Sequence, residues 1–358
     1  MLTPPIKPML ASPVKRIPDE PGWLFEPKWD GYRCLVFREG DEIFMQSRSG
    51  KPLQRYFPEM LTAFAEALPE RIVLDGELIV ALNGRLDFDS LSERVHPARS
   101  RIELLAETKP AQFVAFDLLA LGDADARGEP VRQRREALST LEFTTERVHL
   151  TPATESAATA GTWFELFEGA GLDGVMGKRL DSPYQPGKRS MVKIKHSRTA
   201  DCVLAGLRWH VDGEPGELVG SLLLGLHDSH GVLHHVGVVG SFPVARRRAL
   251  AEELAPLISG GEADHPWLGP GAEDGRRIPG GINRWRSEEQ PWVPLRRERV
   301  LEVSYEHTEG GVPSRFRHNA QFLRWRPDRE PDSCTYEQLE EPVNFDLDAV
   351  LAGRVRAR

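Results

Sequence analysis

One stretch of the chain reads Glu26-Pro27-Lys28-Trp29-Asp30-Gly31-Tyr32-Arg33. It contains a lysine, a carboxylate two residues later, and then a glycine where an apolar segment begins. This combination can place one amine in a tight pocket, but a solvated surface lysine beside a glycine turn would give the same pattern. An amine attacks phosphorus only in its neutral form, and free lysine is protonated at neutral pH. A reactive Lys28 would therefore need cations or a metal ion nearby.

Candidate cations follow later in the chain. Lysine is scarce, with 9 lysines against 37 arginines, and the last of them is Lys195. Met191-Val192-Lys193-Ile194-Lys195 places two lysines on one face of a predicted strand, because side chains alternate along a strand. An exposed sheet edge explains the same spacing equally well. Lys178, which closes the segment after Asp173-Gly174-Val175, is a third candidate.

Two carboxylates and one aromatic residue also stand out. Asp75-Gly76-Glu77 lies between apolar segments, where an unpaired charge is costly, so we expect Glu77 to have a partner or a ligand. Asp173 precedes another apolar segment. Carboxylates of this kind can hold a divalent cation against phosphate oxygens, or simply form turns before glycine. Phe116, in an apolar run, is most simply a core residue.

The segment pattern predicts an α+β fold with two domains and a tail. Residues 1–198 mix strands and helices without regular βαβ spacing, which favours an α+β domain. Residues 199–330 hold five strand-like segments and one helix, which fits a small Greek-key β-barrel of the OB type. Residues 331–358 form an acidic tail. The predicted strands are 31–37, 42–46, 71–82, 113–119, 174–178, 191–195, 202–209, 218–226, 233–239, 300–305 and 316–325, and the predicted helices are 59–68, 155–169 and 244–254.

Composition narrows the class of protein further. The chain has 358 residues, 40% of them hydrophobic and 28% charged, and no apolar run approaches the ~18 residues of a membrane span. The N-terminus does not resemble a signal peptide, and three scattered cysteines argue against a disulfide framework and for a reducing cytoplasm. The net charge of −8 argues against tight unaided DNA binding.

Taken in order, these segments form a recognisable set. Lys28 to Gly31, Ser47-Arg48-Ser49-Gly50, Asp75 to Glu77, Phe113 to Asp117, Asp173 to Lys178 and Lys193 to Lys195 resemble nucleotidyltransferase motifs I, Ia, III, IIIa, IV and V, and Arg324 to Arg329 resembles motif VI. Over about residues 5–330 the chain therefore resembles the ATP-dependent DNA ligases of the covalent nucleotidyltransferase superfamily. It is most similar to the compact bacterial LigC type, related to the ligase module of LigD.

This resemblance implies a nucleotidyltransferase (adenylation) domain, an OB-fold domain and a three-step reaction. Lys28 would attack the α-phosphate of ATP to form lysyl-AMP, the AMP would pass to the 5′-phosphate at a DNA nick, and the 3′-hydroxyl would displace it. By the same resemblance, nucleotide binding falls to Glu26, Arg33, Arg48, Glu77, Phe116, Lys178, Lys193 and Lys195. Glu77 and Asp173 would hold Mg²⁺ or Mn²⁺, Asp30 would act in nick sealing, and Arg326 with Asp328 would orient the pyrophosphate.

The sequence departs from the family pattern in two motifs. Asp173 stands where motif IV usually has glutamate, which shortens the reach to a metal ion. Arg329 stands where motif VI usually has lysine, which keeps the charge but changes its geometry.

The implied partners are nicked double-stranded DNA and a repair polymerase or DNA-end-binding protein that recruits a mildly acidic, monomeric ligase. The implied location is the cytoplasm, at the nucleoid. Three alternatives stay open: an RNA ligase, a capping-type nucleotidyltransferase that uses GTP, and a non-catalytic OB-fold module that binds nucleic acid.

Overall fold

The structure is a computed structural model that describes residues 2–143, 145–258, 264–268, 275–280, 291–310, 313–340 and 345–351. It divides into two compact units, Met1–Lys195 with Pro342–Arg358, and His196–Glu341. The division falls after Lys195, and the chain after residue 330 belongs partly to each unit. No helix in the described part of the chain is long and apolar enough to cross a membrane.

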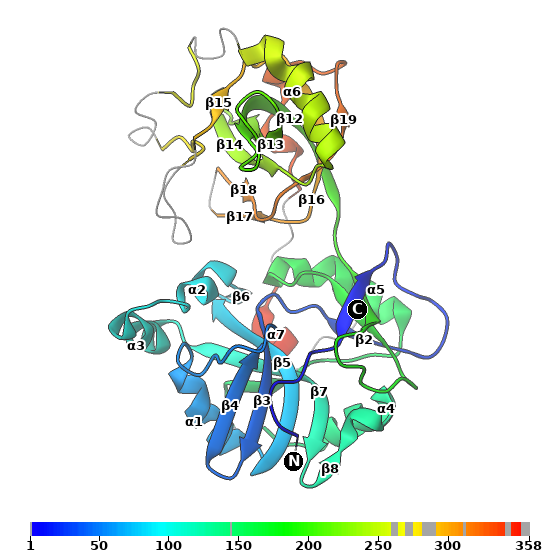
Figure 1. Cartoon of the computed structure of the whole chain (residues 1–358). Coiled ribbons are helices and arrows are strands. Elements are labelled where there is room, and N and C mark those ends of the chain that lie inside the picture. The colour runs from blue at the N-terminus through cyan, green and yellow to red at the C-terminus, as the bar shows by residue number, and fades with distance from the viewer. Residues whose placement is uncertain are drawn as a thin grey trace. The chain divides into compact units, whose positions relative to one another are not determined.

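The first unit contains two β-sheets (Figure 1). The larger sheet has the order β4-β3-β5-β7-β8, with β6 paired to β5 and β9 paired to β7. Its strands are β3 (Tyr32–Glu39), β4 (Glu42–Ser47), β5 (Arg71–Leu82), β6 (Arg85–Leu86), β7 (Ala111–Leu121), β8 (Ala124–Asp125) and β9 (Val148–Leu150). The smaller sheet has the order β1-β11-β10-β2, built from β1 (Leu10–Pro13), β2 (Trp23–Pro27), β10 (Val175–Arg179) and β11 (Arg189–Ile194).

The helices of this unit begin where the local sequence favours it. Proline occupies the first turn of α1 (Pro58–Ala67), and the Ser156 hydroxyl accepts a hydrogen bond from the Thr159 amide at the start of α5. The remaining helices are α2 (Phe88–Glu93), α3 (Arg99–Thr108), α4 (Val131–Ser139) and α5 (Ala157–Phe167), with 3₁₀ turns at Ala126–Gly128 and Glu168–Ala170. Strands and helices together confirm the predicted α+β class.

Apolar side chains from both sheets share one core. Leu35 and Val73 of the larger sheet pack with Met191 of the smaller sheet and with Met9, which precedes β1. This packing brings β3, β5 and β7 near β10 and β11, which are far from them in sequence. Most of the residues singled out in the first unit lie on the strands of its two sheets or at the ends of these strands.

The second unit has the strand order β14-β13-β12-β16-β19, which agrees with an OB-type sheet. Its elements are β12 (Arg198–Trp209), β13 (Val219–His227), β14 (Leu233–Val239), α6 (Val244–Ile258), β15 (Val293–Pro294), β16 (Val300–Tyr305), β17 (Thr308–Glu309), β18 (Arg315–Phe316) and β19 (Gln321–Trp325).

The predicted closed barrel is incomplete among the described residues. The two edge strands are joined by one parallel bridge, between Val239 and Ala320. The cause is that the predicted strand 316–325 is divided: Phe316 belongs to β18, which pairs with β17, and β19 begins only at Gln321.

The described part of the predicted acidic tail contains regular elements in both units. Two 3₁₀ turns, Pro331–Ser333 and Tyr336–Gln338, belong to the second unit, where Tyr336 packs on the core. Helix α7 (Leu347–Leu351) belongs to the first unit, with Leu347 and Val350 fully buried. The apolar residues spaced between the acids account for this packing, which net charge alone concealed.

Candidate active site

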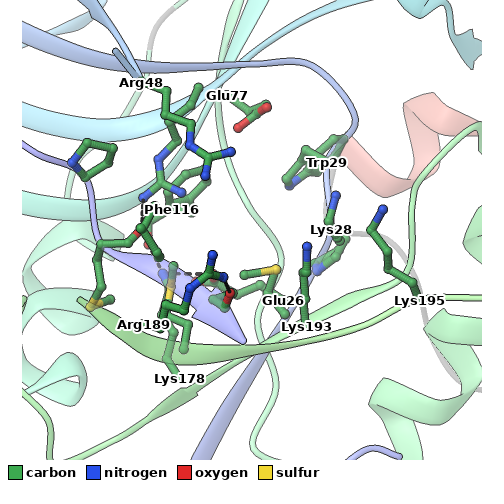
Figure 2. Close-up of a pocket in the computed structure, with 18 residues that line it drawn as sticks. Glu26, Lys28, Trp29, Arg48, Glu77, Phe116, Lys178, Arg189, Lys193 and Lys195 are labelled. Atoms are coloured by element: carbon green, nitrogen blue, oxygen red, sulfur yellow. Dashed lines mark hydrogen bonds and ion pairs between the residues drawn. The ribbon is translucent and has the colours of Figure 1, made fainter. Parts of the chain in front are cut away.

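The first unit contains a pocket of about 310 Å³ lined from both sheets (Figure 2). Nine residues predicted to bind or react with a nucleotide line it: Glu26, Lys28, Arg33, Arg48, Glu77, Phe116, Lys178, Lys193 and Lys195. They come from β2, β3, β5, β7, β10 and β11 and from the turns that follow β2, β4 and β11. The fold therefore gathers residues that span almost 170 positions of sequence.

Along strand β11, every second residue faces the pocket. The four residues at and beyond this strand that line the pocket alternate with residues that do not: Arg189, Met191, Lys193 and Lys195. The predicted shared face of Lys193 and Lys195 is thereby confirmed. Arg189 was missed, although its position in the same alternation could have identified it. Met9 and Ala11 also line the pocket, and Ala11 reaches it because β1 pairs with β11 in parallel.

Lys28 follows β2 and is held by the turn that precedes β10. Its amide donates to the Gly174 carbonyl (2.9 Å), and its carbonyl accepts from the Asp173 amide (2.9 Å). The Lys28 amine is ion-paired with the Asp173 carboxylate, and the Lys195 Nζ lies 3.0 Å from the same oxygen. The segment that carries the predicted nucleophile is thus fixed at both backbone and side chain.

Two glycines of the motifs are required by close backbone approach. A Cβ on Gly31 would lie 2.0 Å from the Leu78 carbonyl oxygen, so any side chain there would push the Lys28 turn away from β5. Gly174 has a φ of +117°, and a Cβ there would lie 2.1 Å from the Ile194 oxygen. These contacts explain why glycine follows each aspartate.

Arg33 and Phe116 form one wall of the pocket. Asp75 accepts two hydrogen bonds from Arg33, at 2.5 Å from Nε and 2.5 Å from the terminal nitrogen. Tyr184 donates to the same carboxylate at 2.6 Å. The Arg33 guanidinium then lies 4.5 Å from the centre of the Phe116 ring. Phe116 is therefore not the core residue that its sequence context suggested, but a pocket residue held by its neighbours.

Lys178 is buried behind the same ring. Its Nζ lies 2.9 Å from Glu26 Oε2 and donates to the Phe116 carbonyl at 2.6 Å. Among the described residues, the other Glu26 oxygen, Oε1, is buried without a hydrogen-bond partner. A buried acceptor of this kind is costly unless a ligand supplies the donor.

Glu77 is the strongly perturbed acid of the pocket. Burial raises its pKa to about 7, although the charges of Arg33 and Lys28 oppose the rise. Near neutral pH this side chain therefore changes between a hydrogen-bond donor and a carboxylate.

The pocket fits a nucleotide with its phosphates. It offers an aromatic face, a buried unpartnered acceptor, and the cations of Lys28, Lys193 and Lys195. The pocket offers few ligands for a divalent cation, because no group of three or more His, Cys, Asp or Glu side chains comes together in the described ranges. One Asp173 oxygen is already shared by two lysines. A metal ion here would depend on nucleotide oxygens and water for most of its ligands.

The other four predicted residues, Asp30, Asp173, Arg326 and Asp328, do not line this pocket. Asp30 is half-buried two positions after Lys28. Arg326 and Asp328 belong to the second unit, where the Arg326 Nε lies 2.9 Å from Asp328 and another nitrogen lies 2.9 Å from Asp201. The hydrogen bond from Arg326 lowers the pKa of Asp328 to about 2.

A lysine fixed in this pocket, in a chain that also carries an OB-type unit, agrees with the predicted nucleotidyltransferase class. Two family descriptions then match: the ATP dependent DNA ligase domain over residues 8–195, and the ATP dependent DNA ligase C terminal region over residues 215–329. The chain therefore belongs to the ATP-dependent DNA ligases, as its motifs predicted.

Curated relatives agree over nearly the whole chain. DNA ligase C of Mycobacterium tuberculosis is 50% identical over 98% of each chain, and DNA ligase C2 of Mycolicibacterium smegmatis is 52% identical over 95% of each. The end-joining protein LigD of Mycobacterium tuberculosis is 38% identical over 66% of this chain and 29% of its own length. A solved Lig E DNA ligase, 17% identical with a TM-score of 0.52, covers 89% of this chain and 98% of its own and supports the fold.

Family membership fixes the general chemistry. The protein is an ATP-dependent DNA ligase that uses ATP and a divalent metal ion and acts on nicked DNA. This finding removes the non-catalytic OB-fold module and the capping enzyme from the alternatives.

Proposed function

We propose that Lys28 is the nucleophile of this ligase, and that the residues around it divide the work of the three steps. The observation that carries the proposal is the position of the Lys28 amine in the pocket, ion-paired to Asp173 and beside Lys195. In the first step Lys28 Nζ bonds to the α-phosphorus of ATP, the bond to the β-phosphate oxygen breaks, and pyrophosphate leaves. Phosphoryl-type transfer of this kind depends mainly on positioning and charge neutralisation.

The base is bound on the Phe116 side of the pocket. Stacking on the Phe116 ring contributes about 1–3 kcal/mol to base binding. The unpartnered Glu26 Oε1 accepts a hydrogen bond from the 6-amino group of adenine, which supplies the donor that this buried oxygen lacks. A guanine base carries a carbonyl at that position, so the same oxygen would disfavour GTP.

The sugar and phosphates are bound on the lysine side. Glu77 contacts the ribose, Arg33 supports the sugar and Phe116, and Lys193 with Lys195 neutralises the α-phosphate. Arg48 is exposed at the rim, where it contacts a phosphate of the nucleotide or of the nick. Lys178 acts indirectly, by holding Glu26 in place.

The remaining residues serve other moments of the cycle. Arg326 and Asp328, which belong to the second unit, orient the departing pyrophosphate. Asp30 acts when the 3′-hydroxyl attacks the adenylated 5′-phosphate. Asp173 and Glu77 would hold a divalent ion, which would neutralise phosphate charge.

We further propose that the cellular role is DNA repair. A relative named for non-homologous end joining supports a role in joining broken ends, with a repair polymerase or DNA-end-binding protein as recruiting partner. Recruitment also fits the net charge of −8, which is unfavourable for unaided DNA binding. The enzyme would work as a monomer at the nucleoid, since one unit supplies the whole pocket.

A nick-sealing assay tests this function. A duplex with one 5′-labelled nick is incubated with protein, with Mg²⁺ or Mn²⁺, and with ATP or GTP. A second duplex, in which one strand at the same nick is RNA, is treated in the same way. We expect a longer labelled strand with ATP on the DNA nick. Sealing only on the RNA-containing nick would show that this ligase prefers an RNA strand at the nick.

A further inference from the structure

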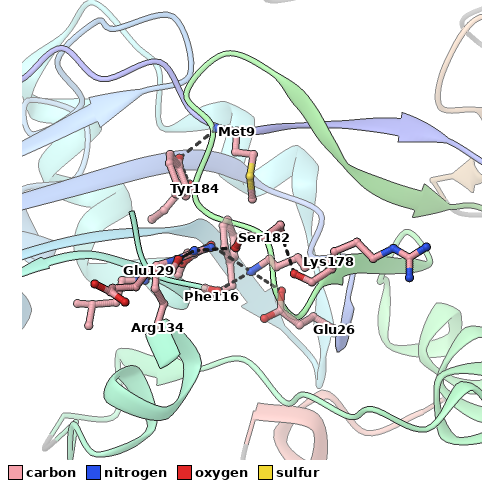
Figure 3. Close-up of polar contacts among 12 residues, drawn as sticks. Met9, Glu26, Phe116, Glu129, Arg134, Lys178, Ser182 and Tyr184 are labelled. Atoms are coloured by element: carbon pink, nitrogen blue, oxygen red, sulfur yellow. Dashed lines mark hydrogen bonds and ion pairs between the residues drawn. The ribbon is translucent and has the colours of Figure 1, made fainter. Parts of the chain in front are cut away.

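A chain of four buried charges of alternating sign runs away from the pocket (Figure 3). Glu26 pairs with Lys178 at 2.9 Å, Lys178 lies 3.6 Å from Asp117, and Asp117 pairs with Arg134 at 2.7 Å. None of the four is more than 4% exposed. Only Glu26 and Lys178 line the pocket, so Asp117 and Arg134 cannot contact the nucleotide.

Arg134 stands at the end of this series of charges that is farthest from the pocket, and several hydrogen bonds hold it. It lies on α4 and holds both oxygens of Asp117, through Nε at 2.7 Å and a terminal nitrogen at 3.1 Å. Its other terminal nitrogen donates to the Glu129 carbonyl at 2.5 Å and the Ser182 carbonyl at 3.2 Å. Burial tends to raise the pKa of Asp117, but Lys178 and Arg134 outweigh it and lower that pKa. Asp117 is therefore a carboxylate that two cations share.

Lys178 lies near both carboxylates of this chain of charges. It lies between two carboxylates, nearer to Glu26 than to Asp117, because Arg134 already satisfies Asp117. Arg135, the next residue on α4, donates to the Thr151 carbonyl at 2.8 Å, and its charge also acts on Glu26 and Asp117, but it forms no ion pair within the chain. The position of Glu26, with Oε2 on Lys178 and Oε1 unpartnered, thus depends on how Asp117 is satisfied.

We propose that Arg134 is a positioning residue for nucleobase selection: by holding Asp117 it leaves Lys178 to Glu26, whose second oxygen then selects the 6-amino group of adenine. This inference rests on the proposed role of Glu26. It adds a residue outside the pocket that determines which purine the enzyme accepts.

The charge order predicts a specific pattern of loss and rescue. Arg134→Met leaves Asp117 with Lys178 as its cation, so Lys178 moves to Asp117 and Glu26 loses its anchor. A second change, Asp117→Asn, removes the competing carboxylate, so Lys178 returns to Glu26. Arg134→Lys keeps a cation beside Asp117 and should preserve selection. A residue that only stabilises the fold would show no such rescue.

The test compares kcat/KM for lysyl-nucleotide formation with ATP and with purine riboside 5′-triphosphate, which lacks the 6-amino group. The wild type should prefer ATP by about tenfold to a hundredfold, the factor that one hydrogen bond to a charged acceptor supplies. Arg134→Met should bring the ratio to within about threefold of one, and Arg134→Met with Asp117→Asn should restore it.

Arg94→Met is the matched control. Arg94 is a fully buried arginine of the same unit, bonded twice to Glu59 at 2.6 and 2.8 Å, and it does not line the pocket. Its loss should lower the melting temperature and both rates together without changing their ratio.

The possible results separate the two claims. A wild type that uses both triphosphates equally overturns the role of Glu26 and this inference with it. A wild type that discriminates, beside a folded Arg134→Met enzyme with an unchanged ratio, overturns the inference alone. If Arg134→Met does not fold, the doubly substituted enzyme decides, because a wild-type ratio supports the charge chain and a collapsed ratio contradicts it.

Discussion

The amine of Lys28 is ion-paired with the carboxylate of Asp173, although 145 positions separate them in sequence. Their backbones are bonded in both directions, from the Lys28 amide to the Gly174 carbonyl and from the Asp173 amide to the Lys28 carbonyl. The acid can therefore hold the amine in place before a nucleotide arrives. Aspartate in place of the usual motif IV glutamate is compatible with this function, because the close backbone contact compensates for the shorter side chain.

Replacing Asp173 by asparagine should slow lysyl-AMP formation by about tenfold to a hundredfold, the worth of a hydrogen bond to a charged group. The amine would keep its neighbours but lose the charge that orients it. Single-turnover labelling with ATP measures the rate. Asp181→Asn, an exposed acid between β10 and β11, should leave it unchanged. An Asp173→Asn enzyme as fast as the wild type would show that the ion pair has no part in the step.

Glu77 should give the reaction an acid limb centred near neutral pH. Burial raises the pKa of Glu77 to about 7, so the side chain is mostly neutral below that pH and a carboxylate above it. If the carboxylate binds the ribose or a metal ion, kcat/KM for ATP falls as the pH drops from 8 through about 7 to 6. Glu77→Gln should be slow at all of these pH values and lack that limb. An identical acid limb in Glu77→Gln would assign it to another group.

The same raised pKa affects stability with a defined sign. The folded protein binds a proton at Glu77 between the ordinary value of 4.5 and about 7, where the unfolded chain has lost it. The stability that Glu77 contributes is therefore present below pH 4.5 and lost as the pH rises to about 7. Nucleotide-free Glu77→Gln should gain stability relative to the wild type over this range, measured by denaturant unfolding.

Phe116→Leu should raise the KM for ATP by about fivefold to a hundredfold, because base stacking contributes about 1–3 kcal/mol. Phe116→Tyr keeps the ring and should stay close to the wild type. The measurement is the ATP dependence of lysyl-AMP formation, with the melting temperature as a check on folding. An unchanged KM in Phe116→Leu would remove the base from this side of the pocket.

Helix α7 should stabilise the first unit despite its acidic surroundings. Leu347 is fully buried, its amide donates to the Gly84 carbonyl at 3.1 Å, and the nearby Phe345 and Phe167 rings are centred 5.3 Å apart. Leu347→Ala should lower the free energy of unfolding of the full chain by about 2 kcal/mol or more. The exposed Asp348 lies on the same helix, and Asp348→Ala should cost less than about 0.5 kcal/mol. Equal effects of the two changes would mean that α7 contributes little packing.

The sequence predicted those features that depend on the spacing of residues close together in the chain. Strand alternation placed Lys193 and Lys195 on one face, and the family resemblance implied that Lys28 and Glu77 act on the same nucleotide. Arg189 shares that alternation but was passed over, because arginine is the common cation of this chain. Arg134 could not be found in this way, since its contact with Asp117 depends on how α4 packs against β7. The strand segments of the OB-type unit were predicted, but the division of its last strand depended on pairing with β17.

The most direct test of the account is covalent labelling. Protein is incubated with α-³²P-labelled ATP and Mg²⁺ or Mn²⁺, and wild type, Lys28→Ala and the control Lys188→Ala are run on a denaturing gel. The account predicts label on the wild type and on Lys188→Ala and none on Lys28→Ala, while Lys28→Ala still seals a nick that is already adenylated. Label that persists on Lys28→Ala would contradict the assignment of the nucleophile, and with it the roles given to the residues around Lys28.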